Sequence, residues 1–219
     1  MTRKSITITA ELQDYLVAHS APLDEIAQDL IAETERLFPN NVSLQIAPEQ
    51  AGFLTFLVRL LNVGHAVEVG TFTGFSSLAI ARGLRPGGHL LCCDINEEWT
   101  SVARRYWERA GVSDRVELRI GPALETLQAL PTEPYLDFAF IDADKTGYPA
   151  YWGELVPRMR PGGVIVVDNV LRHGAVVEPG PHDPSTEAII AFNEQVLADD
   201  RVESVMLPIA DGLTLARRL

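Results

Sequence analysis

Short apolar runs alternate with longer segments of helical spacing along most of this chain. Five such runs have the length and character of buried β-strands, and they lie at about 65–70, 89–95, 116–121, 136–142 and 163–168. Strands that alternate with helices are typical of a parallel sheet covered by helices. The pattern therefore predicts an α/β fold.

The two ends of the chain depart from this alternation. Three helices are predicted before the first strand, at 11–19, 23–37 and 48–61. After the fifth strand, a loop at 172–185 rich in Gly, Pro and His leads to a helix at 186–198. Two further β-like stretches, 202–208 and 213–219, meet at the turn signal Ala210-Asp-Gly212. They predict a closing hairpin.

Two segments, Arg85-Pro-Gly-Gly88 and Arg160-Pro-Gly-Gly163, look like a repeat. Both predict a helix that ends in a glycine turn before a strand, so neither is given a chemical role. No linker and no low-complexity tract interrupts the sequence, and residues 1–219 are expected to form a single domain.

Acidic and amide side chains follow two of the predicted strands. Asp142 ends the run at 136–142, and Asp168 and Asn169 end the run at 163–168. In an open α/β sheet, ligands bind in the crevice beyond the carboxyl ends of the strands. Such oxygen ligands suit Mg²⁺, with Mn²⁺ or Ca²⁺ as alternatives, and a cation beside the ammonium of Lys145 can ionise a hydroxyl near neutral pH. The alternative is that these side chains only cap the next helix or turn.

The first predicted strand runs into a glycine-bounded turn and then a helix near residue 75. Gly70 and Gly74 allow the backbone to approach a ligand, and Glu68 places an acid at the strand end. Asp94, at the end of the next strand, has the spacing of a carboxylate that binds ribose hydroxyls. The Gly-x-x-x-Gly spacing differs from the dinucleotide Gly-x-Gly-x-x-Gly. This spacing disfavours a pyrophosphate ligand, and the acids at the two strand ends favour a ligand with a ribose and a cationic centre. A nicotinamide-dependent oxidoreductase and a noncatalytic nucleotide-binding module remain the rival classes.

Composition excludes some partners. The net charge of −12 argues against a nonspecific nucleic-acid surface, and no run of 18 apolar residues suggests a membrane span. Cys92 and Cys93 are neighbours in a predicted strand and should point to opposite faces as small buried side chains. They cannot form a disulfide framework, so a cytoplasmic location is expected.

Several segments together resemble one enzyme family: Val67-Glu-Val-Gly-Thr-Phe-Thr-Gly-Phe-Ser76, Cys93-Asp-Ile95, Gly121-Pro-Ala123, Ile141-Asp-Ala-Asp-Lys145, Asp168-Asn-Val-Leu171 and Ile209-Ala-Asp-Gly-Leu-Thr214. They are similar, in sequence and in order, to cation-dependent class I S-adenosylmethionine (SAM) O-methyltransferases, the group with caffeoyl-CoA and catechol O-methyltransferases. The bacterial small-molecule branch is the nearest by eye, and the resemblance runs from about Leu44 to the C-terminus.

This resemblance implies a Rossmann-like, seven-stranded mixed sheet whose last strand is antiparallel, with helices on both faces. Residues 1–62 would form a helical cap and residues 63–219 the core. It also implies a homodimer and a small aromatic acceptor, expected to be a vicinal dihydroxy compound.

The resemblance also assigns site residues. Those that would bind SAM are Glu68, Gly70, Thr71, Ser76, Asp94, Ala123 and Asp142. A divalent cation would be held by Asp142, Asp168 and Asn169, with Asp142 and Lys145 as the catalytic pair. Lys145 would take or stabilise the proton that leaves the acceptor hydroxyl.

The chain departs from the family in two places. The segment Leu44-Gln-Ile-Ala-Pro-Glu-Gln-Ala-Gly52 lacks the usual Met, hydroxyl residue and Gly-Gln, although its lid-like position is expected to remain. Arg172 stands where Trp is common. A guanidinium there predicts an acceptor with an acid group, unless Arg172 only pairs with Glu178 or Asp183 of its own loop.

Two other acids are given structural roles. Asp144 should diverge from Asp142 and cap or pair rather than bind a metal. Asp211 lies in the predicted closing turn, where turn chemistry is the simpler explanation.

Overall fold

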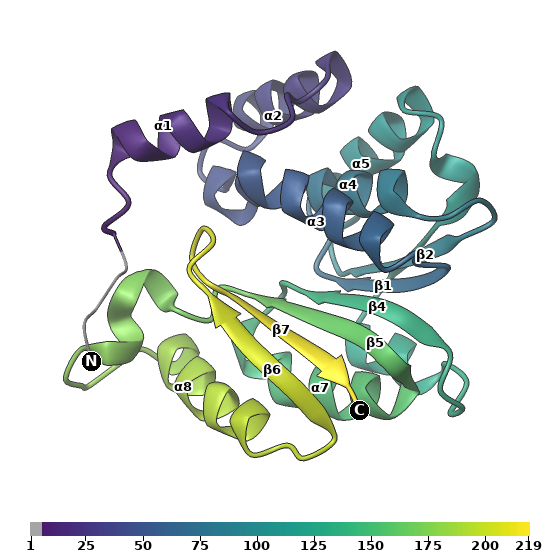
Figure 1. The fold of residues 1–219 in the computed structure, drawn as a ribbon. Helices are drawn as coiled ribbons and strands as arrows, with labels where there is room; N and C mark the ends of the chain where they lie inside the picture. Colours follow the sequence, from purple (N-terminus) through teal and green to yellow (C-terminus); the bar gives the residue numbers. More distant parts are fainter. Residues whose placement is uncertain (1–5) are drawn as a thin grey trace.

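A single mixed sheet organises the molecule in the computed structural model, which describes residues 6–219 (Figure 1). Its strands are β1 His65–Val69, β2 His89–Asp94, β3 Val116–Ile120, β4 Leu136–Ile141, β5 Met159–Asp168, β6 Val202–Leu207 and β7 Leu213–Arg218. They lie in the order β3-β2-β1-β4-β5-β7-β6. β1 to β5 are parallel, and β7 runs antiparallel to both β5 and β6. The predicted seven-stranded mixed sheet with an antiparallel last strand is therefore confirmed.

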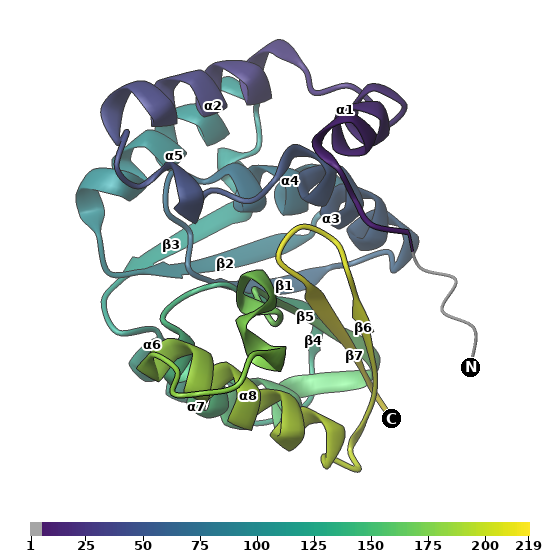
Figure 2. The same ribbon diagram turned by 90° about the vertical axis from the view of Figure 1, so that its left-hand side faces the viewer.

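Helices cover both faces of the sheet (Figures 1 and 2). On one face lie α1 Ala10–Ala18, α2 Glu25–Leu37, α3 Pro48–Leu60, α4 Phe75–Gly83 and α5 Glu97–Arg109. On the other face lie α6 Ala123–Gln128, α7 Tyr148–Arg158 and α8 Pro184–Leu197. Short 3₁₀ turns complete the chain at η1 Val42–Leu44, η2 Ser113–Arg115, η3 Lys145–Gly147 and η4 Arg172–Val177. Within the described part of the chain, none of these helices has the length and apolar character needed to cross a bilayer.

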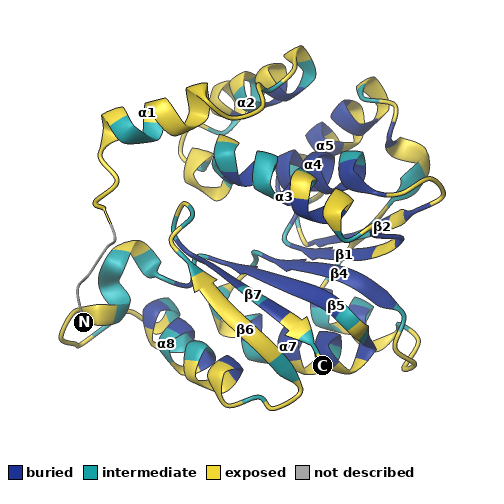
Figure 3. Ribbon diagram, in the orientation of Figure 1, coloured by how far each residue is buried: buried dark blue, intermediate teal, exposed yellow. Residues whose placement is uncertain are grey.

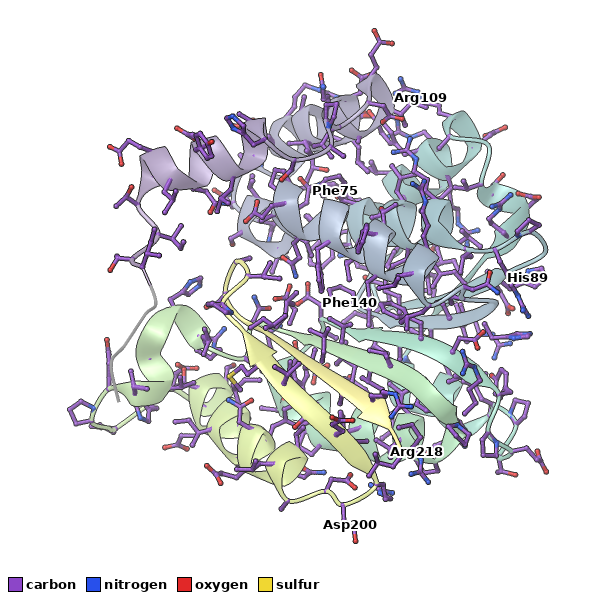
Figure 4. The ribbon with its side chains drawn as sticks, viewed as in Figure 1. Phe75, His89, Arg109, Phe140, Asp200 and Arg218 are labelled. Atoms are coloured by element: carbon purple, nitrogen blue, oxygen red, sulfur yellow. The ribbon has the colours of Figure 1, made fainter. Side chains whose placement is uncertain are left out.

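Two apolar layers form the core, one on each face of the sheet. The central strands β1 and β4, most of β5 and helix α4 are buried, whereas the edge strand β6 is mostly exposed (Figure 3). Figure 4 shows Phe75 and Phe140 between the sheet and the helices of the first face, with His89 and Asp200 at the periphery. Side chains alternate between the layers, so Cys92 lies in one and Cys93 in the other. Both cysteines are buried and unpaired, as predicted from the strand period.

Local capping explains where several helices begin. The side chains of Thr9, Asp24, Asn96 and Asp183 each accept a hydrogen bond from a backbone N–H in the first turn of α1, α2, α5 and α8. The cap at Asp183 starts α8 at Pro184, two residues before the predicted start of that helix.

One turn prediction was wrong. Arg85-Pro-Gly-Gly88 is a turn, in which the N–H of Gly88 donates to the carbonyl of Arg85. The similar segment at 160–163 instead lies inside β5, which begins at Met159. The register between β4 and β5 shifts there by a bulge, and Gly162 takes a left-handed φ of 81° within it. Pairing with β4, which the local sequence does not reveal, makes this segment part of a strand.

Candidate active site

A cavity of about 910 Å³ opens at the carboxyl ends of the parallel strands, under the loop before α3. Its wall includes ten of the residues predicted from the sequence, namely Gly70, Thr71, Ser76, Asp94, Ala123, Asp142, Lys145, Asp168, Asn169 and Arg172. Glu68 is the predicted residue that does not reach this wall. The tertiary structure therefore brings residues from five different segments together around one cavity, whose volume is in the range of small-molecule sites.

The loop after β1 depends on its glycines. Gly70 has a φ of 96°, and a Cβ there would lie 2.1 Å from the carbonyl oxygen of Asp142. Gly74 has a φ of 89°, and a Cβ there would lie 2.5 Å from the Cβ of Ala103 in α5. Both glycines let the loop pack closely between β4 and α5, and Phe75 and Ser76 in the first turn of α4 line the cavity.

Glu68 lies behind this loop, completely buried in β1. Neither carboxyl oxygen has a hydrogen-bond partner among the described residues. Burial raises the pKa of Glu68 to about 7, against the opposing effect of the nearby Ser76 and Thr71 hydroxyls. A buried carboxylate without a partner favours a positively charged group beside it.

Replacing Glu68 with glutamine is expected to stabilise the ligand-free protein above pH 7. Below pH 4.5 the carboxyl is neutral in both states, whereas between pH 4.5 and about 7 the unfolded chain ionises first, so the wild type loses stability as the pH rises. At about 1.4 kcal/mol per pH unit, the loss reaches up to about 3 kcal/mol. Thermal melts from pH 4.5 to 8 should show the two proteins diverging, by roughly 2–4 °C per kcal/mol. The exposed Glu133→Gln is the matched control, and curves for Glu68→Gln that stay parallel to wild type would contradict the prediction.

Asp94 is held in place by backbone donors. One carboxylate oxygen accepts from the N–H groups of Thr71 and Phe72 at 2.9 and 2.8 Å, and the other accepts from Asn96 at 2.8 Å. Asp94 thus fixes the glycine loop to the end of β2. A carboxylate has about four acceptor positions, so one remains for a ligand in the cavity.

Lys145 joins the two acidic strand ends. Its ammonium nitrogen lies 2.9 Å from Oδ1 of Asp142 and 2.6 Å from Oδ1 of Asn169. It also donates to the hydroxyl of Tyr148 at 2.7 Å, and that hydroxyl lies 3.2 Å from the carbonyl oxygen of Asp168. All three ammonium protons therefore have a partner. The lysine predicted one helical turn beyond Asp142 lies at the centre of the site.

Asp168 is the most deeply buried acid of this cluster, with 2% of the residue exposed. Burial and the charge of Asp142 raise its pKa to about 7, while Gln50 and the N–H of Asn169 oppose the rise. Burial also raises the pKa of Asp142, although Lys145 opposes it. Two largely buried carboxylates that repel each other favour a bound cation.

The described residues contain no group of three or more His, Cys, Asp or Glu side chains suited to a metal ion. A metal at this site would therefore depend on the two carboxylates together with the amide oxygen of Asn169. Asn169 has a φ of 57°. In the part of the chain that the structure describes, six non-glycine residues have a positive φ, and five of them line the cavity, which concentrates backbone strain at this site.

Arg172 lies on the cavity wall, with its side chain one quarter exposed. Its closest acid is Asp183, at 3.9 Å, which is too long for a hydrogen bond. Its Nε is buried and has no partner among the described residues. The structure is therefore compatible with both hypotheses for Arg172, binding of an acidic acceptor and pairing within its own loop, because the residue lines the cavity and also lies near Asp183.

The two acids given structural roles make such contacts. Asp144 accepts a 2.5 Å hydrogen bond from the hydroxyl of Tyr151. Asp211 accepts from the N–H of His173 at 2.5 Å, which ties the β6–β7 turn to η4.

Several residues of the site were missed by sequence reasoning. Phe72 and Trp99 form an edge-to-face pair on the cavity wall, with ring centroids 5.1 Å apart. Gln50 contacts Asp168, and Tyr148 contacts Lys145. Of these contacts, only that of Tyr148 could have been predicted from the local sequence, because Tyr148 lies three residues after Lys145, about one helical turn away.

Comparison with known proteins agrees with this geometry. The O-methyltransferase family matches residues 17–219. A probable caffeoyl-CoA O-methyltransferase of Dictyostelium discoideum is 40% identical over 210 residues, which cover 94% of this chain and 91% of that protein. An O-methyltransferase from Bacillus cereus, solved in complex with SAH, has a TM-score of 0.86 and 34% identity over 95% of this chain and 97% of that one. TomG, an O-methyltransferase of Streptomyces achromogenes involved in tomaymycin synthesis and solved with SAM, has a TM-score of 0.85 and 31% identity over 95% and 96%.

Proposed function

Because this chain belongs to the O-methyltransferase family and is a SAM-dependent O-methyltransferase, we propose that its acceptor is a vicinal dihydroxy aromatic molecule bound with a divalent cation. The observation that carries this proposal is the group of Asp142, Lys145, Asp168 and Asn169, which shares one cavity with the glycine loop. A nicotinamide-dependent oxidoreductase and a noncatalytic module, the two rival classes, do not fit a chain of this family.

The decisive experiment is a panel of catechols, each incubated with SAM, with and without Mg²⁺. Methylation of vicinal diols that depends on Mg²⁺ supports the proposal. Methylation of isolated phenols at the same rate without added metal would contradict both the proposed chelation of a vicinal diol and the proposed metal dependence.

The cofactor has a clear set of partners on this chain. The buried carboxylate of Glu68, which has no hydrogen-bond partner within residues 6–219, lies beside the loop and attracts a cationic group through the low-dielectric interior. The open acceptor position of Asp94 suits a ribose hydroxyl, and Phe72 and Trp99 offer aromatic surface to a base. The N-terminus of α4 at Ser76 suits a carboxylate.

The donor set also fits a divalent cation. Asp142, Asp168 and Asn169 offer oxygen atoms only, as Mg²⁺, Mn²⁺ and Ca²⁺ prefer, and the repulsion between the two carboxylates would be relieved by a cation. When bound, such an ion polarises an oxygen and lowers the pKa of a hydroxyl attached to it.

Lys145 is the residue best placed to handle the acceptor proton. Its ammonium is fixed by Asp142, Asn169 and the buried Tyr148 hydroxyl, and it lines the cavity. A positive charge held there stabilises an oxyanion in line with the sulfonium methyl, and the amine form accepts a proton.

Arg172 is proposed to select acceptors that carry an acid group. The guanidinium has no hydrogen-bonded carboxylate of its own, since the Asp183 oxygen is 3.9 Å away. A carboxylate on the aromatic ring could pair with it in the bidentate manner that arginine favours. Dihydroxybenzoates and related catechols are the class this site would prefer over neutral catechols.

Replacing Arg172 with alanine is expected to raise KM for acidic catechols about 10- to 100-fold, because the variant loses a charge-assisted pair worth roughly 1.5–3 kcal/mol. Neutral catechols should change little. Steady-state kinetics with dihydroxybenzoate and unsubstituted catechol measure the difference.

Asp183→Asn is the matched control for this prediction. Asparagine still caps α8 but removes the loop charge beside Arg172. It should leave the preference for acidic acceptors intact. An equal loss on both acceptor types in Arg172→Ala would assign the arginine to the loop alone.

We also propose a homodimer and a cytoplasmic location. Light scattering of the purified protein tests the first, and fractionation of the source cells tests the second.

A further inference from the structure

Gln50 connects two segments that are far apart in the sequence. It lies in the first turn of α3, where 1% of the residue is exposed. Its side-chain nitrogen donates to Oδ2 of Asp168 at 2.6 Å, a contact between residues 118 positions apart. Its side-chain oxygen accepts from the backbone N–H of Ala47 at 3.4 Å. One carboxamide therefore contacts both the acidic cluster and the loop above it.

The contact with Gln50 completes the anchoring of Asp168. Its other carboxylate oxygen, Oδ1, accepts from the N–H of Asn169 at 2.6 Å. With one donor on each oxygen, the carboxylate cannot rotate freely, and its remaining lone pairs are available to the cavity that Asp168 lines.

The loop above the cavity, Ser43 to Ala47, is held by two glutamines. All five of its residues line the cavity. Gln45 donates to the hydroxyls of Thr34 and Thr73 at 3.1 and 3.3 Å, which fixes the loop to α2 and to the glycine turn after β1. Gln50 fixes the other end of the loop to Asp168. The loop thus spans from the glycine turn to the acidic cluster.

From these contacts we propose that Gln50 is a positioning residue. It orients Asp168 toward a divalent cation and couples cation binding to cofactor binding through the loop at 43–47. This inference rests on the proposed metal dependence. Outer-sphere hydrogen bonds to ligating carboxylates commonly contribute 10- to 100-fold in metal affinity, because they fix the orientation of the ligand.

The test uses Gln50→Met, which keeps the length of the side chain and removes both hydrogen-bonding groups. Calorimetric titration with Mn²⁺ alone gives the cation affinity, and the titration is repeated with saturating S-adenosylhomocysteine (SAH). Mn²⁺ should bind the variant about 10- to 100-fold more weakly than the wild type. SAH without Mn²⁺ should bind both proteins within about threefold. SAH should raise Mn²⁺ affinity about fivefold or more in the wild type and less than twofold in the variant.

Gln45→Leu is the matched control, because it loosens the same loop without touching Asp168. It should keep the Mn²⁺ affinity measured without SAH. Gln50→Ala repeats the measurement should Gln50→Met melt below the assay temperature.

Three results would overturn the inference. Equal Mn²⁺ affinity in wild type and Gln50→Met would remove the positioning role. Equal weakening in Gln45→Leu and Gln50→Met would assign the effect to the loop as a whole. A wild type that binds SAH but no Mn²⁺ would overturn the metal dependence itself, and the role of Gln50 with it.

Discussion

Replacing Lys145 with alanine is expected to lower kcat by about 10²–10⁴-fold, the usual range for the loss of a general acid–base group. The ammonium makes three hydrogen bonds at the centre of the site, and its side chain is 13% exposed. Lys145 is also one of only two lysines in the chain, against sixteen arginines. Lysine is a residue type that serves as a general base in enzymes, whereas arginine is not. Single-turnover kinetics across pH 6 to 9 measure the effect.

The same variant should bind Mn²⁺ at least as tightly as the wild type. The lysine donates to Asp142 and Asn169, so its removal frees oxygen atoms and takes away a repelling charge. Tyr148→Phe is the matched control, because it removes one partner of the lysine and keeps the charge. It should cost much less in kcat. If Lys145→Ala had the same rate as the wild type at every pH, the lysine would not be the general base, and solvent would remove the proton.

Alanine at Asp142 or Asp168 is expected to abolish methyl transfer while the fold remains intact. Each substitution leaves two of the three proposed oxygen ligands, and loss of Asp142 also frees Lys145. Asn169→Ala should have a similar or smaller effect, since it removes a neutral ligand. Activity with added Mg²⁺ and Mn²⁺ affinity by calorimetry together measure these losses.

Thermal melting distinguishes a loss of activity caused by a missing ligand from one caused by misfolding. Asp168 ionises with difficulty in the folded state, where its pKa is about 7 against an ordinary 3.8. Stability contributed by the protonated form is present below pH 3.8 and is lost as the pH rises toward 7. Asp168→Asn should therefore melt at a higher temperature than the ligand-free wild type at pH 8 while lacking activity. Full turnover of the wild type in EDTA would contradict the metal role of all three residues.

Much of the site could be predicted because it depends on local order along the chain. A strand followed by Gly70 and Gly74, and strands that end in Asp94, Asp142 and Asp168, define positions at one edge of a parallel sheet whatever the details of packing. The resemblance to O-methyltransferases rested on the same segments, and the family match confirms it. The individual roles of these residues remain predictions that the experiments above address.

Other features could not be predicted because they depend on pairing between distant segments. The bulge at 160–163 reflects the register of β5 against β4, which helical or strand periodicity does not encode. The position of Arg172 on the cavity wall, 3.9 Å from Asp183, likewise depends on how its loop packs against distant elements.

The sequence by itself determined the α/β class, the glycine loop and the acidic strand ends, since hydrophobic period and turn chemistry act over a few residues. Only the tertiary structure decided that Gln50 meets Asp168 and that Glu68 is buried with no hydrogen-bond partner among the described residues. These elements pack together because they bury apolar surface, and that driving force has no direction. The local sequence around a polar residue therefore does not show which distant residue it will contact.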